Sequence, residues 1–522
     1  MAKSRSREPL MVRSRRRFAI TKSVEDVLSE ADRSPDKLKR NLNVLDITAI
    51  GIGAIIGAGI FVLTGVAAAV KAGPAIILSF ILAGAGCGLA ALCYAEFASM
   101  IPISGSAYTY SYATLGELVA WIIGWDLILE YAVGAIAVAI GWSGYLVELF
   151  GAAGVQLPVA LTAGPMAGGA INLPAIFIVL LLTCLLVVGT KESAKINLGL
   201  VVVKIAIILV VIVFGISYVN SKNFEPFMPF GAWGVVGGAG LVFFAYIGFD
   251  AASTTAEEAK NPQRDMPIGI IGSLIISTAL YISAAVVLTG MVPYRLLNQA
   301  APFAYAFSQF NITWATAVIS AGAIAGITSV LLISLLAQPR IFFSLSRDGL
   351  LPARISKVHP RFKTPYISTI VTGIAVAICA GILPIGIAAE LTNIGTLFAF
   401  FLVSIGIIIL RKSRPDLHRP FKVPLVPYLP LAGAGFCLLL MVSLPAITWY
   451  RFIAWLGIGL IIYANYGYHH SKAMRLRREQ AAGNREPGAG GLEPEDRNGD
   501  GGMPEANGPD IPVEPVEEVE NR

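Results

Sequence analysis

Charged residues are scarce in this chain of 522 residues. Asp, Glu, Lys and Arg make up 14% of it, whereas an ordinary soluble domain has about 25%. A soluble fold of this length would need more charge to cover its surface. Hydrophobic residues make up 56%, and the mean hydropathy is +0.71. Apolar runs of about 20 residues, the length that a helix needs to cross a bilayer, recur along the chain. The composition therefore predicts a polytopic membrane protein.

Cysteine and histidine are also rare, and this excludes several functions. The five cysteines lie inside apolar runs, without the spacing of a metal site or a disulfide framework. No histidine lies within a run except His469 and His470, near the end of the last one, which excludes a histidine proton relay. No HExxH, GxSxG or Cys/His pair occurs at membrane depth, so we expect no enzyme, metal or cofactor. From the placement of the formal charge of +6, we expect no nucleic acid partner.

Twelve apolar segments are expected to span the membrane. Lys and Arg crowd segments 1–40, 340–363 and 411–422, which fall on one side if the spans alternate. The positive-inside rule places that side, and with it both termini, in the cytoplasm. The first 40 residues lack the apolar core of a signal peptide. We expect a multi-pass protein of the plasma (inner) membrane. The expected spans are residues 43–70, 75–99, 118–148, 173–189, 197–219, 232–257, 267–291, 314–341, 366–384, 388–410, 428–447 and 451–470.

Glycines interrupt the first span. The stretch GIGAIIGAGIFVLTG, residues 51–65, holds five glycines among residues that are almost all apolar. A dinucleotide-binding turn would need a glycine in place of Ile56 and a preceding strand, so that interpretation fails. Gly53 and Gly57 form GxxxG, a helix-packing motif. Packing can hold beside a further interpretation, in which the glycines break a membrane helix at a binding site.

The sixth span carries a matching interruption at Gly248 and Asp250. The two breaks lie about 190 residues apart (248 minus 58), the length of five spans. Because five is odd, the two halves enter the membrane from opposite sides, as an inverted repeat requires. Free amides near Gly59 would bind an anion, and free carbonyls near Tyr246 would bind a cation. These two poles match the carboxylate and ammonium of an amino acid.

The chain contains the motifs GIGAIIGAGIFVLTG, PISGSAYTYSY (102–112), GWDLILEYAVG (124–134), FFAYIGFDAASTTAEEAKNPQRDMPIGI (243–270), SRDGLLP (346–352) and NIGTLFAF (393–400). They resemble the amino acid–polyamine–organocation superfamily, and most of all prokaryotic members of its cationic amino acid transporter branch. The resemblance implies an all-α polytopic membrane fold. A five-plus-five, LeuT-like inverted repeat with broken helices 1 and 6 would be followed by two C-terminal helices. It also implies secondary, usually proton-linked, amino acid transport. The expected parts are a basic cytoplasmic tail (1–42), the first repeat (43–220), the second repeat (232–411), helices 11 and 12 (428–470) and a disordered cytoplasmic tail (479–522).

The same resemblance implies substrate-binding residues in spans one, six and eight. Amides of the first break would bind the carboxylate, and carbonyls of the second would bind the amine. Phe249 would close over the substrate as an aromatic gate. Small residues of span eight would leave room for a long side chain, although Ile327 takes some of that room. The implied residues are Ile56, Gly57, Ala58, Gly59 and Ile60 in span one, Phe244, Ala245, Ile247 and Phe249 in span six, and Gly326, Ile327 and Ser329 in span eight.

Four charged residues, Asp126, Glu130, Lys204 and Asp250, lie deep in spans, where a charge is a functional candidate. The same resemblance implies that Lys204 is a proton-coupling ammonium held against backbone carbonyls of spans one and eight, with snorkelling to the interface as the alternative. Glu130 would face the substrate and take part in proton coupling, or be a protonated packing residue. Asp250 would cap a helix, contact a cationic substrate, or do both. For Asp126 we favour a structural role.

The predicted function is proton-coupled amino acid transport by alternating access, with arginine, lysine or ornithine as cargo. Three alternatives stay open: a neutral, alanine-type proton symporter, an amino acid or polyamine exchanger, and an amino acid sensor on a transporter fold. The expected partners are the amino acid, protons and the lipid bilayer.

Overall fold

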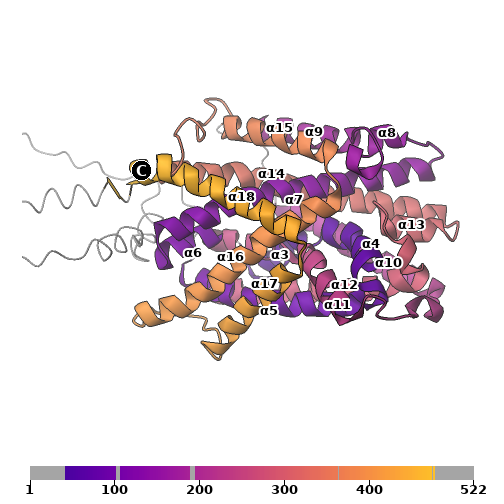
Figure 1. Cartoon of the computed structure of the whole chain (residues 1–522), viewed down its shortest axis with the longest axis horizontal. Helices are drawn as coiled ribbons and strands as arrows, with labels where there is room; N and C mark the ends of the chain where they lie inside the picture. Colours follow the sequence, from indigo (N-terminus) through magenta and orange to yellow (C-terminus); the bar gives the residue numbers. More distant parts are fainter. Residues whose placement is uncertain (1–41, 102–105, 189–193, 363, 473, 476–522) are drawn as a thin grey trace, which may run out of the picture. The chain divides into compact units, whose positions relative to one another are not determined.

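The computed structural model describes residues 42–101, 106–188, 194–362, 364–472 and 474–475. Over these ranges the chain is almost entirely helical (Figure 1), and its β-structure consists of two isolated bridges. Seven of the described helices are long and apolar enough to cross a membrane, and five apolar helices are shorter. The predicted all-α class is confirmed, whereas the number of membrane crossings stays a prediction. The predicted tails lie almost entirely outside the described residues.

The apolar helices lie where the spans were predicted, with ends that differ by a few residues. Spans one and six are exceptions, because each is divided into shorter helices. The apolar helices are α3 (Val44–Ile55), α5 (Ile76–Met100), α7 (Glu117–Ala152), α9 (Leu173–Val188), α10 (Ala194–Gly215), α11 (Gly231–Val242), α12 (Pro262–Met291), α14 (Thr313–Arg347), α15 (Tyr366–Ile382), α16 (Ile385–Ser413), α17 (Tyr428–Ser443) and α18 (Ala446–Ile462). Shorter α-helices are α4 (Thr64–Ala67), α6 (Ser106–Thr114), α8 (Val159–Thr162), α13 (Pro302–Ser308) and α19 (Tyr468–His470).

A capping box begins α3. The Asn43 side chain accepts hydrogen bonds from the N–H groups of Leu45 (2.8 Å) and Asp46 (3.1 Å), and the Asp46 carboxylate accepts the Asn43 N–H (3.0 Å). These bonds satisfy donors that have no partner within the helix. Just before the box, Leu42 forms a parallel bridge with Ala259, which fixes the start of α3 against the segment that follows span six.

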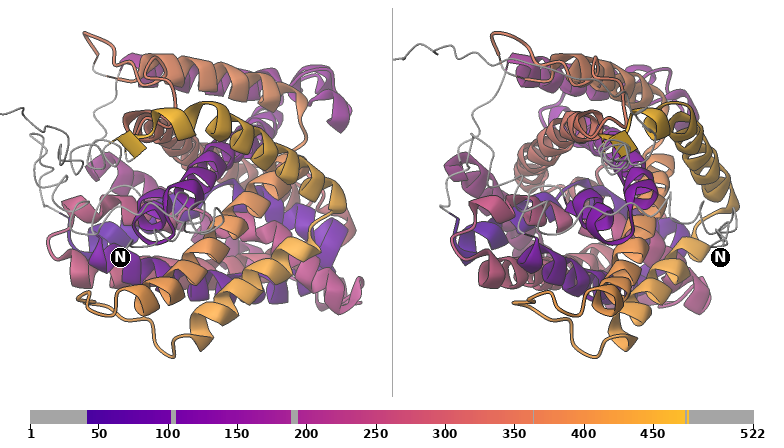
Figure 2. Two further views of the ribbon diagram at one scale, coloured as in Figure 1. Left: turned by 60° about the vertical axis from the view of Figure 1, so that its left-hand side comes forward. Right: turned by 90° about the vertical axis from the view of Figure 1, so that its left-hand side faces the viewer.

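Helix α7 packs against α14 and α16 along its length, and α12 packs against α3 and α5. Tryptophans join α7 to α18: the Trp125 Nε1 donates to the Trp455 carbonyl at 2.9 Å, and the two rings stack 4.5 Å apart. Helices α9 and α15 pack against each other along one edge of the views in Figures 1 and 2. This packing brings the middle of α7 close to the helices that carry the breaks.

A buried ion cluster ties α5 to the segment that follows α16. The Glu96 side chain has no exposed surface, and its carboxylate accepts hydrogen bonds from Arg411 Nε (3.0 Å) and Nη2 (2.5 Å). The Val423 N–H donates to the same carboxylate at 2.7 Å, and Arg419 Nε lies 3.5 Å from it. Charge-assisted, bidentate bonds of this kind are strong, so the cluster holds the ends of α5 and α16 together.

Candidate functional site at the crossing of two broken helices

The first break separates α3 from a short π-helix, Gly59–Leu63. Ile56 is extended there, with φ −75° and ψ 104°. The next helix starts with a hydrogen bond from the Phe61 N–H to the Gly57 carbonyl, 3.3 Å long. For the three N–H groups just before it, the described part of the chain supplies no acceptor. Such a helix start favours an anion.

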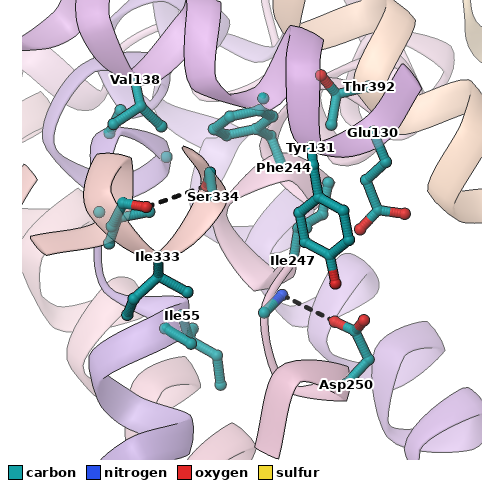
Figure 3. Close-up of a pocket in the computed structure, with 17 residues that line it drawn as sticks. Ile55, Glu130, Tyr131, Val138, Phe244, Ile247, Asp250, Ile333, Ser334 and Thr392 are labelled. Atoms are coloured by element: carbon teal, nitrogen blue, oxygen red, sulfur yellow. Dashed lines mark hydrogen bonds between the residues drawn. The ribbon is translucent and has the colours of Figure 1, made fainter. Parts of the chain in front are cut away.

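The second break separates two 3₁₀ helices, η7 (Phe243–Tyr246) and η8 (Asp250–Glu258). Between them Gly248 has φ +118°, a conformation that residues with a side chain rarely adopt. The Asp250 carboxylate accepts the Gly248 N–H at 3.2 Å (Figure 3). Phe249 occupies the N-cap position of η8, so Asp250 fixes the turn from the first helical position instead of capping the helix.

The two breaks pack against each other reciprocally. Gly59, after the first break, touches Ala245, before the second: a Cβ at Gly59 would lie 2.3 Å from the Ala245 Cα. Gly248, after the second break, touches Ala54, before the first: a Cβ at Gly248 would lie 2.7 Å from the Ala54 carbonyl oxygen. Glycine at both positions therefore allows the two backbones to touch.

A tyrosine of α12 joins the two breaks. The buried Tyr281 hydroxyl lies 3.0 Å from the Ile55 carbonyl oxygen and 2.9 Å from the Ala245 carbonyl oxygen. It thus shares its single hydrogen between the last turns of the helices that precede the breaks. Sequence reasoning did not select Tyr281, whose one signal was a hydroxyl group in the middle of an apolar span.

Lys204 of α10 is buried and reaches the first break. Its Nζ donates to the Gly53 carbonyl, in the last turn of α3, at 2.5 Å. Its methylene groups pass Gly326 of α14, where a Cβ would lie 2.9 Å from the Lys204 Cγ. The Lys204 side chain lies between spans one and eight, as predicted, and does not extend to the surface. Its role in proton coupling stays a prediction.

A cavity of about 610 Å³, its mouth included, opens beside the crossing. Residues of both breaks and of α7, α14 and α16 line it. Figure 3 shows the Glu130 carboxyl and the Tyr131 hydroxyl directed toward Asp250, with Val138 and Ile333 on the opposite side. The cavity therefore combines two carboxyl groups, an apolar wall and the free amides of a helix start.

Half of the predicted substrate-binding residues line this cavity, and half do not. Those that line it are Gly57, Ala58, Gly59, Glu130, Phe244, Ile247 and Asp250. Those that lie outside the lining are Ile56, Ile60, Ala245, Phe249, Gly326, Ile327 and Ser329.

The predicted gate, Phe249, is fully buried in an aromatic cluster. Its ring centroid lies 5.6 Å from that of Tyr94 and 4.9 Å from that of Phe400. Phe244 is the aromatic residue of span six that lines the cavity. In α14, Ser329 donates to the Gly326 carbonyl at 2.9 Å, so its hydroxyl serves the helix itself.

Sequence reasoning missed several lining residues of α7, α14 and α16. In α7, Gly134 and Val138 follow Glu130 at intervals of four, a spacing that places all three on one helix face and could have revealed them. In α14 the lining begins just after the predicted residues. The missed residues of these helices are Tyr131, Gly134, Val138, Val330, Ile333, Ser334 and Thr392.

The model of the amino acid permease family matches residues 42–464. The chain belongs to this family. The permease is therefore a transporter and not an enzyme. Its predicted membership of the amino acid–polyamine–organocation superfamily is confirmed.

Relatives of the permease are named for different cargoes. It is 51% identical to the methylthioribose transporter of Bacillus subtilis (strain 168), over 85% of this chain and 97% of that protein. It is 48% identical to the branched-chain amino acid permease BcaP of the same organism, over 86% of this chain and 98% of that protein. It is 40% identical to the vacuolar cationic amino acid transporter 4 of Arabidopsis thaliana, over 76% of this chain and 67% of that protein.

Proposed function

We propose that this permease carries cationic amino acids, such as arginine, lysine or ornithine, by proton-linked alternating access. The proposal depends on one observation: Glu130 and Asp250 line one cavity beside the free amides of the first break. Two buried carboxylates need compensating positive charge. An amino acid with a basic side chain brings two positive charges, its α-ammonium and its side-chain cation.

Each part of such a cargo has a partner in the cavity. The amides that follow Gly57 would bind the carboxylate. Asp250 and the carbonyls at the end of η7 would bind the ammonium, and Glu130 would bind the side-chain cation. The apolar wall at Val138 and Ile333 would contact the methylene groups between the two charges.

We propose that Lys204 links proton movement to the shape of the first break. Its ammonium donates to the Gly53 carbonyl, which lies just before the break. Gain and loss of the lysine proton would strengthen and weaken this charge-assisted bond. The end of α3 would then be held in one protonation state and released in the other.

Alternating access requires two halves that rearrange around a fixed site. We infer that residues 43–220 and 232–411 form inverted repeats in a twelve-span protein whose termini are both in the cytoplasm, at the plasma (inner) membrane. The reciprocal contacts of Gly59 and Gly248 support this inference. A two-fold relation between the halves would exchange one contact for the other.

A neutral aliphatic amino acid is the second candidate cargo. The apolar wall formed by Val138, Val330 and Ile333 suits an aliphatic side chain. The relative at 48% identity is named a branched-chain amino acid permease. A neutral amino acid brings one positive charge, so one of the two carboxyl groups would then have to bind a proton.

The test is uptake of labelled L-arginine into proteoliposomes, with and without an inside-alkaline pH gradient. Unlabelled L-alanine and L-leucine serve as competitors. We expect the gradient to raise arginine accumulation and Lys204→Gln to abolish that response. Glu130→Gln should weaken arginine binding more than leucine binding, because a hydrogen bond to a charged group contributes about 1.5–3 kcal/mol. The matched control is Glu148→Gln, on the same helix and outside the cavity lining.

Three results would contradict the proposal. Accumulation of leucine or alanine without arginine would favour the second candidate. Uptake that occurs only into vesicles preloaded with substrate would indicate an exchanger. Equal effects of Glu130→Gln and Glu148→Gln on arginine would remove Glu130 from the cargo site.

A further inference from the structure

Asp126 is a buried carboxyl group without a partner. It lies nine residues into α7 and has no exposed surface. Among the described residues, neither of its carboxylate oxygens has a hydrogen-bond partner. An ionised carboxylate without a partner is costly to bury, so this group must either bind a proton or pair with a cation. The structural role predicted for Asp126 does not account for a polar group that bonds to nothing.

The fold leaves room for this carboxyl group. Gly395 of α16 faces Asp126, and a Cβ at Gly395 would lie 2.6 Å from the Asp126 Oδ1. The space that the carboxyl occupies therefore depends on a glycine in the neighbouring helix. Glycine supplies no hydrogen-bonding side chain, so the space accommodates the carboxyl without neutralising it.

Glu130 lies one turn further along α7, on the same face as Asp126 and about 6 Å along the axis. Its Oε1 also lacks a hydrogen-bond partner in the described part of the chain, and its side chain lines the cavity. Its carboxyl is directed toward Asp250, which lines the same cavity (Figure 3). The ion pairs found among the described residues do not include Asp126.

These carboxyl groups form a row that begins at the cavity and runs toward the N-terminal end of α7. Like charges at short distance prevent neighbouring carboxyls from ionising together, so protons are shared along such a row. Asp126 is the member furthest from the cavity, and it contributes nothing to the cavity lining.

We propose that Asp126 is a proton-binding residue of the transport cycle, paired with Glu130. When a cationic group of the cargo binds to Glu130, the O–H bond of the Glu130 carboxylic acid breaks, and its carboxylate pairs with the cation. Asp126 is until then a neutral carboxylic acid. When the N-terminal half of α7 becomes accessible, the O–H bond of Asp126 breaks and its proton passes to water, while the proton from Glu130 forms the new O–H bond on Asp126. This inference depends on the proposed proton-linked transport.

The test uses the full-length protein in proteoliposomes that contain a pH-sensitive dye, with labelled L-arginine as cargo. Asp126→Asn keeps the size of the side chain and removes its ability to carry a proton. We expect proton-driven arginine accumulation and proton entry to fall at least tenfold. Arginine counterflow at equal pH should stay within twofold of the wild type, with the same half-saturating concentration.

Two further variants support the interpretation. Gly395→Ala would displace the Asp126 carboxyl without changing its chemistry, and should reduce proton entry per arginine while counterflow continues. Glu148→Gln, at the other end of α7, should match the wild type in both assays.

Wild-type behaviour of Asp126→Asn in both assays would overturn the inference and leave the proposed function intact. A parallel loss of counterflow and of arginine affinity would also overturn it, because Asp126 would then serve binding or folding. If the wild type itself moves arginine without protons, the proposed function fails, and the inference fails with it.

Discussion

The conformation of Gly248 gives the sharpest prediction about the crossing of the two breaks. This residue combines φ +118° with direct contact to the Ala54 carbonyl of the other broken helix. Gly248→Ala would therefore strain the backbone and place a methyl group 2.7 Å from the Ala54 oxygen. Because that oxygen belongs to the backbone of α3, one of the two breaks has to shift.

The free-energy cost expected for Gly248→Ala has two sources, the backbone strain and the contact with Ala54. A residue with a side chain in a sparsely populated φ region costs about 1–3 kcal/mol. At about 1.4 kcal/mol for each factor of ten, this corresponds to a loss of roughly 5- to 150-fold in the population of the arrangement that binds cargo. The displaced contact with Ala54 adds to this loss. We therefore expect at least a fivefold weaker affinity for the transported amino acid.

The assay is equilibrium binding of labelled arginine to purified permease, together with initial uptake rates. Gly134→Ala is the matched control, because it adds a methyl group to the same cavity where the nearest atom, Thr392 Cγ2, is 3.7 Å away. We expect this control to bind within threefold of the wild type. Equal affinities of Gly248→Ala and Gly134→Ala would refute the argument that the crossing requires glycine.

Two further predictions concern groups that hold the helices together. Tyr281→Phe removes the hydroxyl between the two breaks, so the uptake rate should fall severalfold. The helix content measured by circular dichroism should stay unchanged. An unchanged uptake rate would contradict this role of Tyr281. Glu96→Gln leaves the guanidinium of Arg411 without its carboxylate. This loss should destabilise the protein by about 3 kcal/mol and lower its midpoint of thermal unfolding in detergent. An unchanged midpoint would show that the cluster is not needed for stability.

The sequence was sufficient to locate the helices and both breaks. The length of each apolar run determines where a membrane helix begins and ends. A cluster of glycines within such a run can be recognised without knowledge of its neighbours. The breaks were predicted at about residue 58 and at Gly248, and the helices before them end within a few residues of these positions.

The rotation of each helix about its own axis was not predictable in the same way. Phe244 and Phe249 lie in the same break region, but packing against Tyr94 turns Phe249 away from the cavity that Phe244 lines. The surroundings of Asp126 depend on Gly395, which is 269 residues away in sequence (395 minus 126). Contacts between distant segments decide these features, and no local pattern encodes them.

The reciprocal contact of the breaks has a consequence for the evolution of cargo choice. Gly59 and Gly248 touch the opposite backbone, so a side chain at either position would displace that backbone, whatever the cargo. The wall from α7 carries no such restriction at Gly134, where an added Cβ would make an ordinary van der Waals contact with Thr392. New specificities can therefore arise by exchange of wall side chains around an unchanged backbone core. Relatives named for methylthioribose, branched-chain amino acids and cationic amino acids are 40–51% identical to this chain, as such a division would allow.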